Sequence, residues 1–108
     1  MMGRVAELSA DEFAATIAHA ELPVLVDFWS PSCAPCRTLA PILEEIAEEN
    51  EGYASIAKVN TALYPSIVSE FGINSLPTLL LFHRGKVVER MTGVQPKHKL
   101  QSALDEIE

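Results

Sequence analysis

The spacing of apolar residues along the chain predicts alternating strands and helices. Residues 24–29 form an apolar run that only Asp27 interrupts, and such a run is typical of a central strand covered on both faces. Between residues 39 and 47, apolar side chains recur three and four positions apart. This spacing predicts a helix that begins at residue 33 or 34 and ends near residue 50.

Shorter patterns predict the remaining elements. Ser9 and Glu12 have the spacing of a capping box and indicate a first helix over about residues 10–20, preceded by a short strand. The further elements are strands at 55–60, 78–83 and 86–92, a short helix at 64–71 and a last helix after Pro96. Alternating strands and helices that end in a hairpin and a helix imply a mixed sheet with helices on both faces.

Length and composition favour one folded domain. The chain has 108 residues, of which 48% are hydrophobic, and it shows no repeat or linker. The net charge of −7 argues against a nucleic-acid partner, because phosphate binding needs clustered Lys and Arg. Much of the acidic charge lies in residues 44–51 and 105–108. We interpret these segments as solvated helix ends, with a docking patch for a basic partner as the alternative.

The sequence shows neither a targeting segment nor a membrane segment. No apolar stretch follows Arg4, so no secretory signal is predicted. The longest apolar runs are far too short to span a bilayer. We therefore expect a soluble, cytoplasmic protein with no membrane partner.

The two cysteines, Cys33 and Cys36, lie where the predicted central strand gives way to a helix. A helix N-terminus offers unpaired N–H groups and a partial positive charge, which stabilise a thiolate at Cys33. Cys36, one turn further, is expected to point inward. Ala34 and Pro35 between them leave the sulfurs within bonding reach. The pattern predicts a redox pair in which Cys33 attacks a substrate disulfide and Cys36 resolves the mixed disulfide.

Three other interpretations of this cysteine pair are weaker. A structural zinc site needs four ligands, and nothing in the sequence places His19, His83 or His98 beside the two cysteines, so no metal site is predicted. A structural disulfide is rare in a cytosolic protein, and one that closes so short a loop contributes little stability. Two inert, buried thiols are the third alternative.

The cysteine motif and its surroundings resemble the thioredoxin family almost residue by residue. The matching segments are residues 24–29, 33–37, 40–47, 58–60, 71–73 and 76–82, with Gly85 and Gly93. They follow the family's order and spacing and cover almost the whole chain. The resemblance implies the thioredoxin fold, an α/β fold of three layers in which about four helices flank a mixed sheet of about five strands.

The same resemblance implies a function and partners. It indicates a protein disulfide reductase and general electron donor in redox homeostasis, with a reversible disulfide between Cys33 and Cys36. The expected partners are disulfide-containing client proteins and a thioredoxin reductase. Because that reductase would supply the electrons through NADPH and FAD, no cofactor is expected to be bound in this chain. A monomer is expected.

The resemblance also assigns roles to residues around the cysteines. Asp27 matches a buried aspartate beneath the inner cysteine, so it is expected to act as general base for Cys36, with a pKa raised by burial. Lys58 matches the lysine near that aspartate, and Trp29 matches a tryptophan packed near the active site. The alternatives are a frayed strand end for Asp27, a solvated Lys58 and a Trp29 that only fills the core.

A substrate groove is implied on the other side of the cysteines. Pro77 matches the family's cis-proline, which presents the backbone of Leu76 to an extended substrate like an added strand. The alternative is a trans-proline that opens a strand. Gly93 matches the glycine that lines this groove, although a strand-end glycine would look the same, and Ser32 and Ser75 complete the expected groove.

The active-site motif departs from the family's usual W-C-G-P-C. Ser32 replaces a large aromatic residue and Ala34 replaces glycine, which makes the turn a better helix former by about 1 kcal/mol. Ala62 stands where an acidic residue is usual. Since Pro35 is kept, we expect reducing chemistry with an altered choice of partner. A specialised oxidoreductase with few clients and a binding module without turnover are the alternatives.

Overall fold

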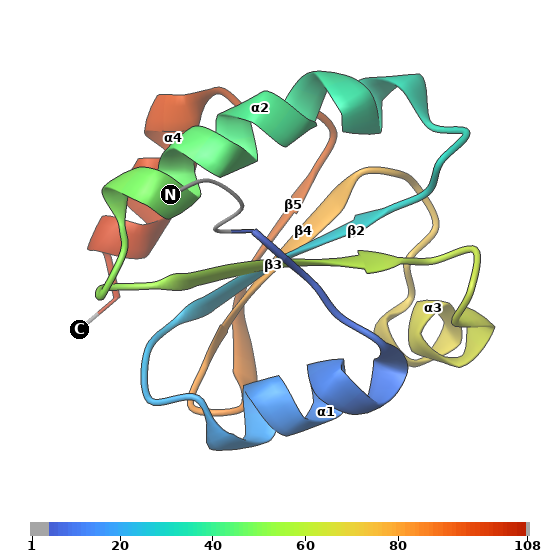
Figure 1. Ribbon diagram of the computed structural model, residues 1–108, viewed down its shortest axis with the longest axis horizontal. Helices are drawn as coiled ribbons and strands as arrows, with labels where there is room; N and C mark the ends of the chain where they lie inside the picture. Colours follow the sequence, from blue (N-terminus) through green and yellow to red (C-terminus); the bar gives the residue numbers. More distant parts are fainter. Residues whose placement is uncertain (1–4, 108) are drawn as a thin grey trace.

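A central sheet lies between two layers of helices in the computed structural model, which describes residues 5–107 (Figure 1). The elements are β1 (Ala6–Glu7), α1 (Ala10–His19), β2 (Val24–Trp29), α2 (Ala34–Glu49), β3 (Ser55–Asn60), α3 (Pro65–Phe71), β4 (Thr78–His83), β5 (Lys86–Thr92) and α4 (Lys97–Asp105). This order is the predicted one, and the mixed sheet in three layers confirms the predicted fold class. Arg4, on which the prediction of no secretory signal rests, and Glu108 lie outside the described residues.

The five-stranded sheet has the order β1-β3-β2-β4-β5, so β2 is its central strand. β3 runs parallel to both β1 and β2, whereas β4 is antiparallel to β2 and to β5. In this register Asp27 of β2 lies between Lys58 of β3 and Leu79 of β4. The carboxylate that interrupts the apolar run therefore sits in the middle of the sheet.

Alternation along β2 decides which helical layer each side chain meets. Leu25 belongs to the core beneath α2 and α4, while Val24, Val26 and Phe28 belong to the core beneath α1 and α3. Figure 1 shows these two helix pairs on opposite faces of the sheet. By this alternation Asp27 lies on the face that α2 covers, which is also where the cysteines are.

Local sequence explains where the helices begin and end. In α1 the predicted capping box is formed, with the Ser9 Oγ accepting from the Glu12 N–H at 3.1 Å and the Glu12 carboxylate accepting from the Ser9 N–H at 2.9 Å. α3 ends at Gly72, whose φ of +61° favours glycine. α2 is continuous through Pro41.

α2 is tied to α4 by contacts that the sequence patterns do not indicate. The buried Asn50 donates to the Ile46 carbonyl at 2.8 Å and exchanges two hydrogen bonds with the Gln101 amide, of 2.7 and 3.0 Å. At the start of α4, Lys97 pairs with carboxylates of α2, Glu45 at 3.1 Å and Glu49 at 2.5 Å. These contacts hold the helix that carries the cysteines against its neighbour.

Two details of the fold depart from what the sequence suggests. The spacing of Leu100, Ala103, Leu104 and Ile107 predicts that all four lie on one face of the last helix. α4 ends at Asp105, so Ile107 lies beyond the helix, although it still packs against the core beneath α2 and α4. β5 is an edge strand, and its neighbouring apolar residues Val87 and Val88 are both exposed. In residues 5–107 we find no helix with the length and apolar character needed to cross a membrane.

Candidate active site

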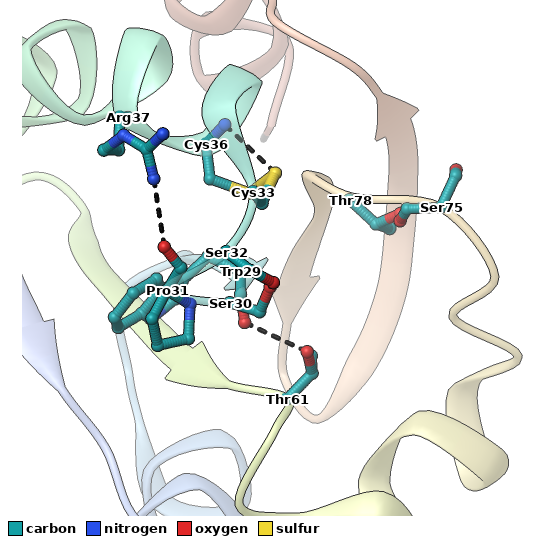
Figure 2. Close-up of a disulfide and its surroundings, with 10 residues drawn as sticks. All are labelled: Trp29, Ser30, Pro31, Ser32, Cys33, Cys36, Arg37, Thr61, Ser75 and Thr78. Carbon is teal, nitrogen blue, oxygen red and sulfur yellow. Dashed lines mark hydrogen bonds between the residues drawn. A yellow bond between two sulfur atoms is a disulfide. The ribbon is translucent and has the colours of Figure 1, made fainter.

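Cys33 and Cys36 form a disulfide at the N-terminus of α2, with their Cα atoms 5.3 Å apart (Figure 2). Cys33 is the N-cap residue in extended conformation, and its sulfur accepts a hydrogen bond of 3.2 Å from the Cys36 N–H. Cys33 is partly exposed, whereas only 4% of Cys36 is accessible to solvent. Cys33 is therefore the cysteine that a partner protein can approach, whereas Cys36 is shielded.

The loop before the cysteines is held from two sides. The Arg37 guanidinium of α2 donates to the Pro31 carbonyl at 3.0 Å (Figure 2). After β3, the backbone N–H and the hydroxyl of Thr61 both donate to the Trp29 carbonyl, at 2.8 and 3.0 Å. Ser32 at the tip is exposed, as are Ala34 and Pro35 in the first turn of α2. Cys33 thus sits between small, accessible side chains at the end of an anchored loop.

The residues of the predicted groove are joined by their own hydrogen bonds. The Leu76–Pro77 peptide bond is cis, as the resemblance implies. The Thr78 hydroxyl donates to the Ser75 carbonyl at 2.6 Å, which closes the turn around this bond, and the Gly93 N–H donates to the Pro77 carbonyl at 2.8 Å. Figure 2 includes Ser75 and Thr78 among the surroundings of the disulfide.

Beneath Cys36 lies a cavity of about 170 Å³ that brings together most of the remaining predicted residues. Asp27, Trp29 and Lys58 line it together with Cys36. Asp27 is buried, and neither its Oδ1 nor the Nε1 of Trp29 has a hydrogen-bond partner within residues 5–107. A carboxyl group with free hydrogen-bonding capacity therefore shares a cavity with the inner cysteine.

The electrostatics of this cavity favour a carboxyl group that gains and loses a proton near neutrality. Burial raises the pKa of Asp27 from its ordinary value of 3.8 to about 7, because desolvation disfavours the charged form. The positive charge of Lys58 opposes this increase in pKa, and the negative charge of Glu7 adds to it. The Lys58 Nζ lies 5.0 Å from the centre of the Trp29 ring.

Sequence reasoning missed Glu7 and Arg37. Arg37 follows directly after the motif, but only the folded loop shows that it reaches back to Pro31. Glu7 lies far from the motif in sequence, and the pairing of β1 with β3 brings it beside Lys58. Within residues 5–107, no three His, Cys, Asp or Glu side chains gather in a way that could hold a metal ion.

Comparison with known proteins adds to this geometry. The family model described as Thioredoxin matches residues 4–106. The chain belongs to the thioredoxin family. Among its relatives, Thioredoxin 1 of a Nostoc species is 40% identical over 96% of this chain and 97% of its own length, and the thioredoxin of a Synechocystis species is 41% identical over the same shares. The thioredoxin of Alicyclobacillus acidocaldarius is 47% identical over 79% of this chain and 81% of its own length.

Membership of the family and the paired cysteines together establish the reaction class. The chain is a thiol–disulfide oxidoreductase with protein disulfide reductase activity, and its substrates are disulfide-containing client proteins. Its own redox-active disulfide joins Cys33 to Cys36.

Proposed function

We propose that the chain is a general protein disulfide reductase in which Cys33 attacks and Cys36 resolves. The Cys33 thiolate attacks one sulfur of the client disulfide, and the other client sulfur leaves as a thiolate. The Cys36 thiolate then attacks the Cys33 sulfur, so the mixed disulfide breaks and the second client sulfur leaves. Two electrons pass to the client, and the chain ends with the Cys33–Cys36 disulfide.

The different surroundings of the two sulfurs support this division of roles. Cys33 is the more exposed cysteine and caps α2, where the partial positive charge of the helix stabilises a thiolate. The hydrogen bond from the Cys36 N–H adds a donor to the same sulfur. Cys36 is almost fully buried, which suits a thiol that reacts only with its neighbour.

Asp27 is the proposed proton acceptor for Cys36. Both side chains line the same cavity, and the raised pKa of Asp27, about 7, suits a general base that works near neutral pH. The thiol proton of Cys36 passes to the Asp27 carboxylate as the Cys36 thiolate forms.

The cis bond at Pro77 supports a docking mode for clients. By the resemblance to the family, the residue before this proline, Leu76, presents its backbone to the client, and the hydrogen bond from the Gly93 N–H to the Pro77 carbonyl holds this segment beside the start of β4. An extended client segment can pair with this backbone as an added strand. The small, exposed Ser32 leaves room for a bulky client residue beside Cys33.

The rest of the cycle is proposed from membership of the family. A separate thioredoxin reductase returns the Cys33–Cys36 disulfide to the dithiol with electrons from NADPH through FAD, so this chain itself binds no cofactor. The chain acts in the cytoplasm as a monomer and a single domain.

Recycling by a generic thioredoxin reductase tests this function. The assay follows NADPH oxidation with insulin as the client, and the wild-type chain is expected to sustain turnover while Cys33→Ser abolishes it. Turnover of insulin with dithiothreitol but not with the reductase would indicate a specialised oxidoreductase that needs a dedicated reductase. Failure of both assays would contradict the proposal and indicate a binding module without turnover.

A further inference from the structure

Three charged residues form a row across three neighbouring strands. In the sheet register Glu7 of β1 pairs with Lys58 of β3, and Lys58 pairs with Asp27 of β2. By the alternation along each strand, all three side chains lie on the face that α2 covers. The row leads from the exposed edge of the sheet to the buried carboxyl group beneath Cys36.

Lys58 is the middle member of this row and is shared between its neighbours. Its Nζ lies 3.8 Å from the Glu7 Oε1 and 5.0 Å from the centre of the Trp29 ring. Within residues 5–107 no ion pair joins it to Asp27, whose Oδ1 has no hydrogen-bond partner. The ammonium group thus has an anionic partner on the solvent side and none on the buried side.

We infer that Glu7 is a positioning residue for the resolving step, because its carboxylate holds the Lys58 ammonium away from Asp27. The inference rests on the proposed role of Asp27 as proton acceptor for Cys36. Were Lys58 to pair with Asp27, the carboxylate would be stabilised in its charged form and would become a weaker base. Glu7 prevents this by competing for the same cation.

The charged groups around Asp27 are consistent with this role. Lys58 faces it from β3 and Glu7 lies beyond Lys58 on β1, while α2 contributes Arg37 and Glu44 to the lining of the cavity. On the remaining side β4 pairs the uncharged Leu79 with Asp27. The positive charge of Lys58 lowers the pKa of Asp27, and the negative charge of Glu7 also raises it directly, so the test must separate this direct effect from an effect through Lys58.

A titration of the Asp27 carboxyl carbon by NMR, in the oxidised protein, tests the inference without any turnover. The disulfide keeps both thiols from titrating, so the carboxyl group is observed without coupling to them. We expect Glu7→Gln to shift the Asp27 midpoint downward by a few tenths of a pH unit, the size typical of a charge pair that is partly exposed. Glu48→Gln, on the exposed side of α2, removes the same charge and should leave the midpoint unchanged.

The Lys58→Met background separates an effect through Lys58 from a direct effect of the Glu7 charge. If Glu7 acts by holding Lys58, then Glu7→Gln shifts the midpoint less than half as much in Lys58→Met as in the wild type. An equal shift in both backgrounds, or no shift in either, would overturn the inference. The proposed function has its own test, because an Asp27→Asn variant that resolves mixed disulfides with unchanged pH dependence would refute the role of Asp27 and leave the titration result standing.

Discussion

The backbone N–H of Cys36 donates a hydrogen bond of 3.2 Å to the sulfur of Cys33. One turn of helix thus supplies the thiol that we propose as the resolving one and also a donor for the sulfur that we propose attacks the client. Because this donor belongs to the backbone, replacing the Cys36 side chain leaves it in place. The roles of the two cysteines can therefore be separated by substitution.

Asp27→Asn is expected to stabilise the protein at pH 8. The carboxyl group has a pKa of about 7 when folded and 3.8 ordinarily, so the folded state binds the proton more tightly. Stability contributed by the protonated carboxyl is fully present below pH 3.8 and is lost as the pH rises toward 7. A pKa shift of this size corresponds to a loss on the order of 4 kcal/mol in the free energy of unfolding between acidic pH and pH 8. The neutral side chain of Asn avoids much of this loss.

Urea unfolding of the wild type and of Asp27→Asn, at pH 8 and in the most acidic buffer in which both remain folded, measures this difference. The gain in free energy of unfolding should be large at pH 8 and should shrink progressively as the pH falls. A gain that is the same at every pH would show that burial of the charge is not its cause.

The redox potential is expected to lie near −270 mV, in the thioredoxin range and far from the oxidising value of about −120 mV. The expectation rests on membership of the family and on Pro35, which the motif keeps despite Ser32 and Ala34. Trp29 is the only tryptophan and lines the cavity with Cys36, so its fluorescence should report the redox state. Equilibration in glutathione buffers gives the potential, and a value close to that of the oxidants would refute this prediction.

Asn50→Ala should destabilise the protein by about 1–3 kcal/mol. The substitution removes the hydrogen bond to the Ile46 carbonyl and both bonds to the partly buried Gln101 amide, and such bonds contribute roughly 0.5–1.5 kcal/mol each. Ser102→Ala is the matched control, because Ser102 lies next to Gln101 in α4 and is exposed. Chemical denaturation measures the free energy of unfolding of both variants and of the wild type. If Asn50→Ala were as stable as Ser102→Ala and the wild type, the pairing of Asn50 with Gln101 would contribute nothing to stability.

Most of the fold could be predicted from the sequence because its signals are local. The apolar run at Val24–Trp29, the capping box at Ser9 and Glu12, and the helical spacing after Cys33 each involve neighbours along the chain. The same holds for the placement of the cysteines at a helix start. The position of Asp27 within an apolar strand also predicted a buried carboxylate, and the structure confirms it.

The features that could not be predicted depend on contacts between distant segments. Asn50 and Gln101 are 51 residues apart, and no local pattern links them. Glu7 reaches Lys58 only through the register of β1 on β3, a strand pair of two residues each. In β5, Val87 and Val88 are exposed while Met91 packs against the core beneath α2 and α4, and the sequence of the strand does not tell that it lies at the sheet edge.

Trapping a client on the Cys36→Ser variant tests the division of roles between the two cysteines most directly. Reduced Cys36→Ser, mixed with oxidised insulin, should accumulate a mixed disulfide on Cys33 that mass spectrometry identifies, since no thiol remains to resolve it. The Cys33→Ser variant should form little adduct, because Cys36 is buried. A stable adduct on Cys36 of Cys33→Ser, or none on Cys33 of Cys36→Ser, would contradict the assignment of Cys33 as nucleophile and Cys36 as resolving thiol.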